Sequence, residues 1–257
     1  MMMEKESSVP EEPGRVSLFG IPYVVGDLEG VSRALAEKAV RADAPYLVAH
    51  SDVHVLTRML RDPEYGEGLR RFDAICPDGM PLVWLLRRKE APAQRLYGPD
   101  MMEWMWRRSA AFGLRHFLLG GSPEAVRLLQ ERLHARYPGA VVAGQYCPPM
   151  PPWPDGEDER ILRQLRESRA HCVWVALGCP RQERWLYRHR DELPPAVYFG
   201  VGAAFNFHAG LVRQAPPWVR RHGLEWLFRL CCEPRRLFRR YLAHNCLFLW
   251  YLMTRKV

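Results

Sequence analysis

Several short apolar runs of the sequence end in polar residues, and Asp78 has the clearest chemical potential among them. It follows Ala74–Cys76 and Pro77, and it precedes Gly79 and a predicted helix. A carboxylate at this place can accept a proton from an attacking hydroxyl, bind a ribose or cap the helix, and the local residues alone favour capping. Asp78 is therefore a candidate general base, with the cap as the alternative.

A second polar corner follows the apolar run Tyr46–Ala49, where His50, Asp52 and His54 lie close together in the sequence. With Asp78 they can form an acid/base cluster or a metal site. Their spacing matches no metal motif, so we expect no metal and no other cofactor.

Glycines follow other apolar runs, at Gly120-Gly121-Ser122 and at Gly178-Cys179-Pro180. Glycine lets the backbone approach a ligand, and the next helix N-terminus can hold a phosphate; the alternative is that these glycines only form the turn. After the second turn, Gln182 can read a base edge and Glu183 can hold ribose hydroxyls, unless they merely complete the helix end. Neither G-x-G-x-x-G nor a Walker motif is present, so a dinucleotide or P-loop site is not supported.

Short apolar runs alternate with longer amphipathic ones, which predicts an α/β fold with a parallel sheet flanked by helices. The predicted strands are Tyr46–Ala49, Ala74–Cys76, His116–Leu119, Val141–Ala143, Cys172–Leu177 and Val197–Val201. The predicted helices are Val53–Leu60, Met80–Arg88, Met101–Phe112, Pro123–Tyr137, Glu157–Ser168 and Gln182–Arg190. Because ligands of such sheets bind at the carboxyl ends of the strands, the polar and glycine-rich positions above are expected to share one edge.

Two breaks divide the chain. The proline-rich stretch Cys147–Pro154 predicts a stiff loop beside the ligand edge, since proline fixes φ and lacks an N–H. The break at Gln214–Pro217 separates a body, residues 16–211, from a C-terminal appendage, residues 212–257, which is expected to be basic and helical. Residues 1–15 are expected to be disordered, and their polar, acidic start resembles neither a signal peptide nor an anchor.

The appendage carries the whole net charge of +8, because it holds ten Lys/Arg and two Glu while the rest of the chain is balanced. A basic segment suggests an anionic partner, which can be a membrane surface, a phosphorylated substrate or nucleic acid. The alternative is a solvent-exposed basic surface that binds no partner. Trp and Tyr interleaved with the basic residues favour a lipid headgroup interface. The longest late apolar stretch, Cys246–Met253, is far shorter than the roughly 20 residues of a membrane span. We therefore expect peripheral attachment to an anionic membrane.

Seven cysteines without a C-x-x-C pair indicate reduced thiols and a cytoplasmic protein. Together with the basic appendage, this predicts a position on the inner face of the cell membrane. A homo-oligomer is left open.

Seven strings occur in the order found in a known family, and the match runs from about Tyr46 to Tyr241. They are D-G-M-P-L-V-W, R-L-Y-G-P-D, F-L-L-G-G-S-P, Y-P-G-A-V-V-A-G, V-A-L-G-C-P-R-Q-E-R-W, G-V-G-A-A-F-N-F-H-A-G and A-P-P-W-V-R-R-H-G-L-E-W-L-F-R-L-C-C-E-P-R-R-L-F-R-R-Y. Each string is weak alone, but the ordered set resembles the WecG/TagA/CpsF glycosyltransferase family.

The resemblance implies a Rossmann-like body and an enzyme that takes a UDP-sugar, commonly UDP-N-acetylmannosamine, and a polyprenyl-diphosphate-linked sugar as acceptor. It also implies inversion of the anomeric centre without a metal, and an appendage that docks on the membrane and closes the active site. Asp78 becomes the general base, and Arg220, Arg221 and Arg229 of the appendage are placed to meet diphosphate. The implied substrate-binding and nucleotide-binding residues are His50, Asp52, His54, Gly79, Arg95, Asp100, Gly120, Gly121, Gly178, Gln182 and Glu183.

The sequence departs from the family pattern at two places. His50 and Asp52 stand where T-x-N is common, while Asp52 and His54 approximate an N-x-H variant; G-A-A-F-N replaces G-G-A-F-D at 202–206. The donor is therefore expected only as a hexose or N-acetylhexosamine. The altered corner also suggests an alternative, a non-catalytic nucleotide-sugar-binding relative, whereas a nucleic-acid partner rests on the basic tail alone and is not expected.

Overall fold

The computed structural model describes residues 13–255 of the 257-residue chain. Most of the segment expected to be disordered, residues 1–12, lies outside the described residues. The described chain enters a short antiparallel hairpin at once, with strands β1 (Arg15–Leu18) and β2 (Ile21–Val24). Phe19 and Gly20 turn the hairpin with φ of 53° and 74°, as tight two-residue turns require. The sequence patterns had not indicated this hairpin.

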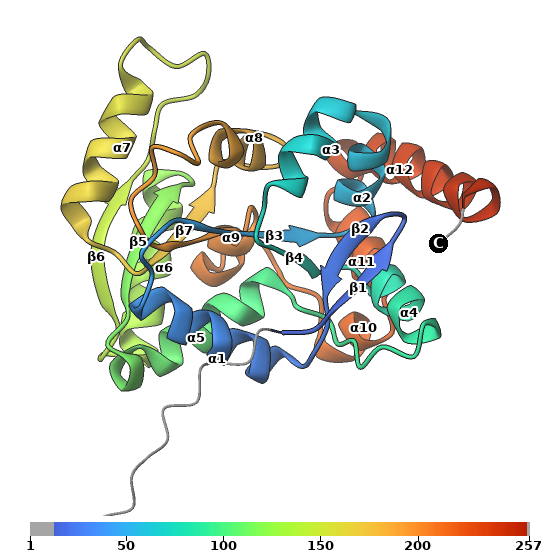
Figure 1. Ribbon diagram of the computed structural model, residues 1–257, viewed down its shortest axis with the longest axis horizontal. Helices are drawn as coiled ribbons and strands as arrows, with labels where there is room; N and C mark the ends of the chain where they lie inside the picture. The colour runs from blue at the N-terminus through green and yellow to red at the C-terminus, as the bar shows by residue number, and fades with distance from the viewer. Residues whose placement is uncertain (1–12, 256–257) are drawn as a thin grey trace, which may run out of the picture.

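A six-stranded, wholly parallel sheet forms the centre of the molecule (Figure 1), as the alternating pattern predicted. Its strands run in the spatial order β4-β3-β8-β7-β5-β6. Their bounds are β3 (Tyr46–Ser51), β4 (Ala74–Pro77), β5 (Arg115–Gly120), β6 (Val141–Tyr146), β7 (Cys172–Ala176) and β8 (Val197–Gly200). The six predicted strands are thereby confirmed.

Helices cover both faces of the sheet, because alternate residues of each strand feed two separate cores. In β7, Val173 packs with one core and Trp174 with the other. The Val173 side holds α2 (Val53–Arg61), α3 (Pro63–Arg70), α4 (Met80–Arg88), α7 (Glu157–Ser168) and α8 (Arg181–Arg188). The Trp174 side holds α1 (Leu28–Val40), α5 (Gly98–Phe112), α6 (Pro123–Arg136) and α9 (Ala204–Ala209).

The strand order places a topological switch point between β5 and β7. From β5 the chain passes through α6 to β6 on one side, while from β7 it passes through α8 to β8 on the other side. Two neighbouring strands whose connections leave in opposite directions open a crevice at their carboxyl ends, where ligands of doubly wound sheets bind. The glycine turns after β5 and β7 lie at this crevice.

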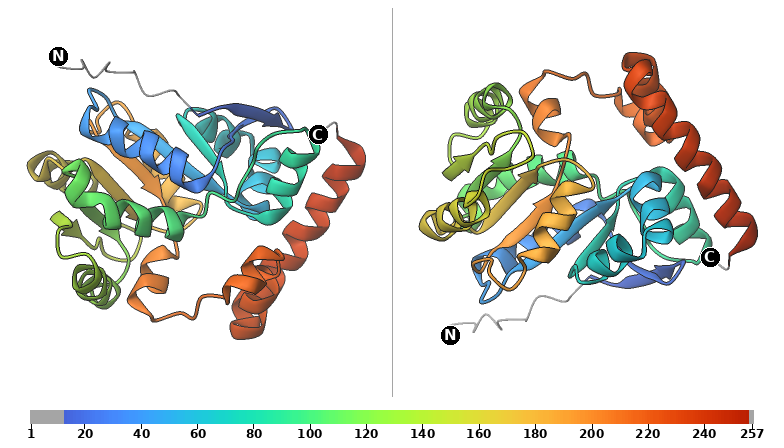
Figure 2. Two further views of the ribbon diagram at one scale, coloured as in Figure 1. Left: turned by 90° about the horizontal axis from the view of Figure 1, so that it is seen from below. Right: turned by 90° about the horizontal axis from the view of Figure 1, so that it is seen from above.

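The appendage is helical and packs on the body. It contains α10 (Pro217–Arg221), α11 (Glu225–Cys232) and α12 (Pro234–Thr254), and α12 lies against α2. Leu237, Phe248 and Tyr251 of α12 are buried. Figure 2 shows α12, in red, running along one end of the molecule beside α4. Between residues 13 and 255, no helix combines the length and apolar character needed to span a bilayer.

Candidate active site

Asp78 lies where β4 gives way to α4. Its backbone N–H donates to the Ser51 carbonyl at 2.9 Å, so β3 and β4 stay paired up to this residue. The cap position of α4 is occupied by Gly79, and no side chain caps that helix. The alternative role for Asp78, helix capping, is therefore wrong; its carboxylate pairs with Arg95, whose Nη2 lies 3.1 Å from Asp78 Oδ1.

Arg95 joins the body to the appendage at this point. Its Nε donates to the Asp78 backbone carbonyl, and its Nη1 donates to Oε2 of Glu225 in α11 at 2.7 Å. The Tyr97 hydroxyl donates to Glu225 Oε1 at 2.9 Å, and the Arg95 guanidinium lies 3.9 Å from the centre of the Tyr97 ring. Four groups from two parts of the chain thus form one network.

The surroundings of Asp78 make it a better base than an ordinary aspartate. Burial raises the pKa of Asp78 to about 7; Arg95 opposes this shift, while the carboxylates of Asp52 and Glu225 add to it. A base works best when its pKa is near the operating pH, because it is then both ionised and able to hold the proton. Asp78 meets that condition at neutral pH.

The raised pKa of Asp78 also affects the stability of the fold, and this effect can be measured without substrate. Because the folded protein holds the Asp78 proton more tightly than the unfolded chain does, stability is lost as the pH rises from about 4 to about 7. Asp78→Asn should remove this loss, so its advantage in free energy of unfolding should be absent near pH 4 and reach about 2–4 kcal/mol above pH 7. Thermal melts of both proteins across this range measure the difference, with the exposed Asp43→Asn as control. A difference that does not vary with pH would contradict the raised pKa.

Asp78 and Gly79 line a cavity of about 500 Å³ between the body and the appendage. Its polar lining includes Asp52, Asp78 and Arg95, and much of its apolar lining comes from α4 and α12. The apolar side chains include Trp84, Leu85, Phe248, Leu249 and Leu252. A cavity with both kinds of lining suits a ligand that has a polar head and an apolar tail.

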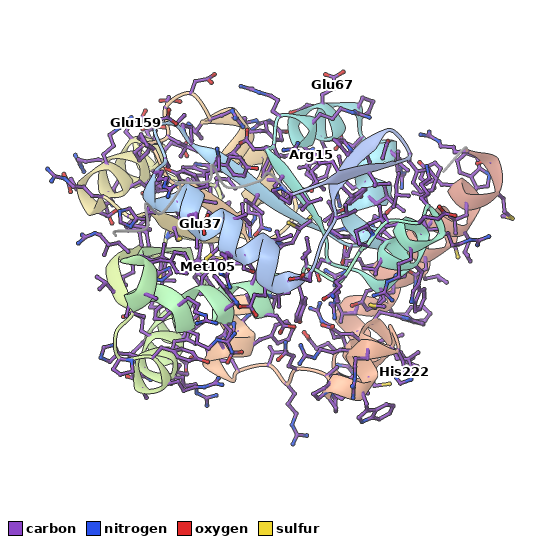
Figure 3. The ribbon with its side chains drawn as sticks, turned by 60° about the horizontal axis from the view of Figure 1, so that its bottom comes forward. Arg15, Glu37, Glu67, Met105, Glu159 and His222 are labelled. Carbon is purple, nitrogen blue, oxygen red and sulfur yellow. The ribbon has the colours of Figure 1, made fainter. Side chains whose placement is uncertain are left out.

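The three candidate arginines of the appendage are placed differently. Arg220 and Arg229 line the cavity, and each keeps a buried Nε without a hydrogen-bond partner. Arg220 forms an ion pair with Asp100, in the first turn of α5, with 3.0 Å between Nη1 and Oδ1. The partner of Asp100, a predicted binding residue, is thus an arginine of the appendage. Among the described residues Arg229 forms no ion pair, and its guanidinium lies 5.5 Å from the Phe207 ring. Arg221 is exposed and does not line the cavity; Figure 3 labels its neighbour His222 on the outer side of this segment.

The three polar residues at the end of β3 and the start of α2, His50, Asp52 and His54, are divided between the cavity and the interior. Asp52 caps α2 through the Val55 N–H at 2.9 Å and lines the cavity. His54 also lines it and meets His244 of α12 edge to face, with 4.3 Å between ring centres. His50 lies behind the cavity, buried, with neither ring nitrogen hydrogen-bonded. Burial, supported by Arg95, lowers the pKa of His50 to about 4, so its ring is neutral.

A second cavity, of about 480 Å³, lies at the switch point between β5 and β7. Gly120, Gly121 and Ser122 line it together with the proline-rich loop and Arg181. A Cβ on Gly120 would lie 2.7 Å from a backbone carbon of Ala176, and its φ is +96°, so a side chain is excluded there. The N-terminus of the 14-residue helix α6 opens on this cavity, where it can hold a phosphate.

Gln182 and Glu183 point inward and line neither cavity. Gln182 Oε1 accepts from the Gly202 N–H at 3.1 Å, and its Nε2 donates to Glu183 Oε1 at 2.7 Å. Burial raises the pKa of Glu183. Gly178 has a φ of +81° and accepts from the Gln182 N–H, so it forms the turn into α8. These contacts give the two side chains a structural role in holding neighbouring loops, and Arg181, which the sequence patterns did not suggest, takes the place beside the ligand edge.

Sequence reasoning also missed Glu225, Tyr97 and Trp84. A usable sign existed for Glu225, which is one of two acidic residues in a strongly basic segment. Among the described residues, no group of three or more His, Cys, Asp and Glu side chains is arranged to hold a metal ion.

A glycine-lined cavity at the switch point and a separate cavity lined by Asp78 and arginines place the molecule among the α/β proteins whose sites can hold phosphate groups. Residues 16–257 match the model of the glycosyl transferase WecG/TagA/CpsF family, and the chain belongs to this family. The protein is therefore a glycosyltransferase. It is 26% identical over 224 residues, covering 86% of this chain and 84% of the relative, to the N-acetylglucosaminyldiphosphoundecaprenol N-acetyl-beta-D-mannosaminyltransferase of Bacillus subtilis (strain 168).

Proposed function

We propose that the protein transfers a hexose or N-acetylhexosamine from a UDP-sugar to a sugar linked through diphosphate to a polyprenyl lipid, in the synthesis of a polysaccharide or cell-wall polymer. The observation that carries the proposal is the cavity at Asp78. It combines this carboxyl, whose pKa is about 7, with arginines and with apolar side chains. The name of the Bacillus subtilis relative, which describes transfer to a diphosphoundecaprenol-linked sugar, supports the same substrate classes.

The two cavities suit the two substrates of this reaction. The glycine-lined cavity offers the backbone approach and the α6 N-terminus that a nucleotide diphosphate needs, with Arg181 as a cation. The cavity at Asp78 offers polar side chains together with apolar ones from α4 and α12, as a lipid-linked sugar needs. We assign the UDP-sugar to the glycine-lined cavity and the acceptor to the cavity at Asp78.

The proposed chemistry is a single displacement. An acceptor hydroxyl gives its proton to the Asp78 carboxylate, its oxygen bonds to the anomeric carbon, and the bond from that carbon to the UDP oxygen breaks, so UDP leaves with the electron pair. Attack from the side opposite UDP inverts the anomeric centre. Arg181 of the glycine-lined cavity faces the leaving UDP, while Arg220 and Arg229 of the cavity at Asp78 pair with the diphosphate of the acceptor; no metal is needed, because guanidinium N–H groups match phosphate oxygens.

A panel assay tests the reaction. The protein is incubated with several UDP-sugars, each with a short-chain polyprenyl-diphosphate-N-acetylglucosamine, and products are weighed by mass spectrometry. We expect one donor to add one sugar to the lipid, with an inverted linkage by NMR and undiminished turnover in EDTA. No product with any donor, in a preparation that binds UDP, would favour the non-catalytic alternative.

The appendage surface supports attachment to an anionic membrane at the inner face. On α12, Phe238, Leu242, Leu249 and Met253 are exposed at spacings that keep them on one side of the helix. Arg235 and Arg239 are exposed near its start, and Trp218 and Trp226 are exposed on α10 and α11. Apolar side chains flanked by basic ones suit the headgroup region of a bilayer.

Sedimentation with vesicles checks this surface. We expect binding to phosphatidylglycerol vesicles, weak binding to phosphatidylcholine vesicles, and a marked loss at high salt because charge attraction is screened. Phe238→Ser together with Leu249→Ser should weaken binding, whereas Val141→Ser, an exposed residue of the edge strand β6, should not. Equal binding by both vesicle types would contradict an anionic partner.

A further inference from the structure

The Arg95 guanidinium is shared between a carboxylate of the body and a carboxylate of the appendage. We propose that Glu225 is a positioning residue for the general base: by holding Arg95, it keeps this cation from pairing fully with Asp78 and leaves the Asp78 carboxylate able to accept a proton. The inference rests on the proposed role of Asp78 and adds a residue that neither the family match nor the relative assigns.

The geometry of Arg95 carries the first step. Its Nη2 lies 3.1 Å from Asp78, but its Nη1 is taken by Glu225 at 2.7 Å, and its Nε donates to the Asp78 backbone carbonyl. Asp78 therefore receives a single side-chain contact in place of a two-pronged pair. Two-pronged arginine–carboxylate pairs are the stronger kind and hold the carboxylate ionised and weakly basic.

The position of Glu225 is fixed by a second contact. One of its oxygens accepts from Tyr97 at 2.9 Å while the other accepts from Arg95, and its side chain is only 11% exposed. Tyr97 in turn lies under the Arg95 guanidinium. Because both oxygens are engaged, Glu225 holds Arg95 in one orientation.

The charged and titratable groups that face Asp78 come from several elements. They lie at the start of α2, in β4, in α4, in the segment between α4 and α5, and in the appendage: Asp52, His54, Cys76, Arg88, Arg95, Tyr97, Arg220, Glu225, Arg229 and His244. Burial is the largest cause of the raised pKa of Asp78, Arg95 opposes it, and Asp52 and Glu225 add to it. Removing the charge of Glu225 acts twice in one direction, because it removes a like charge and releases Arg95 toward Asp78.

Since Glu225 belongs to α11, this arrangement exists only while the appendage is packed on the body. With the appendage displaced, Arg95 is free to pair fully with Asp78, and the base is weakened. Docking of the appendage thus prepares the base as well as completing the cavity.

The test is Glu225→Gln, which keeps the shape and hydrogen-bonding capacity of the side chain and removes its charge. Transfer rate is measured against pH with the UDP-sugar that is active in the panel and the same lipid acceptor. The rate of the unaltered protein should rise with pH through the Asp78 pKa, and in Glu225→Gln this rise should move down by about one pH unit. The control is Glu103→Gln, which removes a carboxylate paired with Arg136 and Tyr137 outside both cavities and should leave the rise in place. An unmoved rise in Glu225→Gln overturns the proposal.

A second measurement does not depend on turnover. The gain in melting temperature from Asp78→Asn is followed against pH in the presence and absence of Glu225→Gln. In the Glu225→Gln background we expect the gain in melting temperature to be smaller and to level off at a lower pH. An identical gain in both backgrounds overturns the proposal. Full transfer activity in Asp78→Asn overturns the base assignment and the role of Glu225 together. Lost activity in that variant, with an unshifted profile in Glu225→Gln, overturns the role of Glu225 alone.

Discussion

Asp78→Asn is expected to lower the rate of sugar transfer by about 100-fold to 10,000-fold, the usual contribution of a positioned acid or base. Asparagine keeps the size of the side chain and can still contact Arg95, but it cannot take the acceptor proton. The measurement is the initial rate with the active UDP-sugar at pH 8, where the unaltered carboxylate is ionised.

Donor binding separates this loss from damage to the fold. Because Asp78 lies outside the glycine-lined cavity, UDP should bind Asp78→Asn with unchanged affinity in calorimetry. Asp43→Asn, an exposed carboxylate before β3, should transfer at the normal rate. A reduction smaller than about tenfold in Asp78→Asn would show that another group, or water, receives the proton.

Arg229→Ala is expected to lower the transfer rate at limiting lipid acceptor by about 10-fold to 100-fold, since a hydrogen bond between charged groups contributes about 1.5–3 kcal/mol. Arg229 lines the cavity, has a buried and unpaired Nε, and forms no ion pair with the described residues, so its charge is available to a diphosphate. A loss of activity in Arg220→Ala would be harder to interpret, since this substitution also removes the ion-pair partner of Asp100.

Arg221→Ala is the matched control for this experiment. It removes the same charge from the same basic segment, but from an exposed side chain that does not line the cavity. We expect its transfer rate in detergent to stay within about twofold of normal, in the range of ordinary surface changes. Equal losses in Arg221→Ala and Arg229→Ala would mean that the segment acts through its overall charge and not through one placed guanidinium.

Hydrophobic periodicity was sufficient to predict the parallel sheet, because most of its strands are short, buried and mainly apolar runs between two covering layers. The hairpin β1–β2 escaped prediction, since it is two four-residue strands with a proline in the second. The appendage was expected to be basic and helical, but its charge pattern did not show that Leu237, Phe248 and Tyr251 turn inward and that α12 packs on α2.

The candidate site was predicted in part. Asp78, Asp52, Arg95 and Arg229 do line one cavity. Asp52 and Asp78 meet there because they follow the neighbouring parallel strands β3 and β4, whose carboxyl ends share one edge of the sheet. That Gln182 and Glu183 turn inward was not foreseen, because the sequence cannot tell an inward-facing side of a first helical turn from a ligand-facing one. Glu225 was missed because its partners, Arg95 and Tyr97, lie about 130 residues away, and only the packed appendage brings them together.

The cavity beside Asp78 has walls from opposite ends of the chain, with Asp52 on one side and Leu252 on the other. During synthesis the sheet and the glycine-lined cavity can form first, whereas the cavity at Asp78 lacks one wall until α12 has left the ribosome. Under the proposed assignment, the acceptor side of the site therefore assembles later than the nucleotide side.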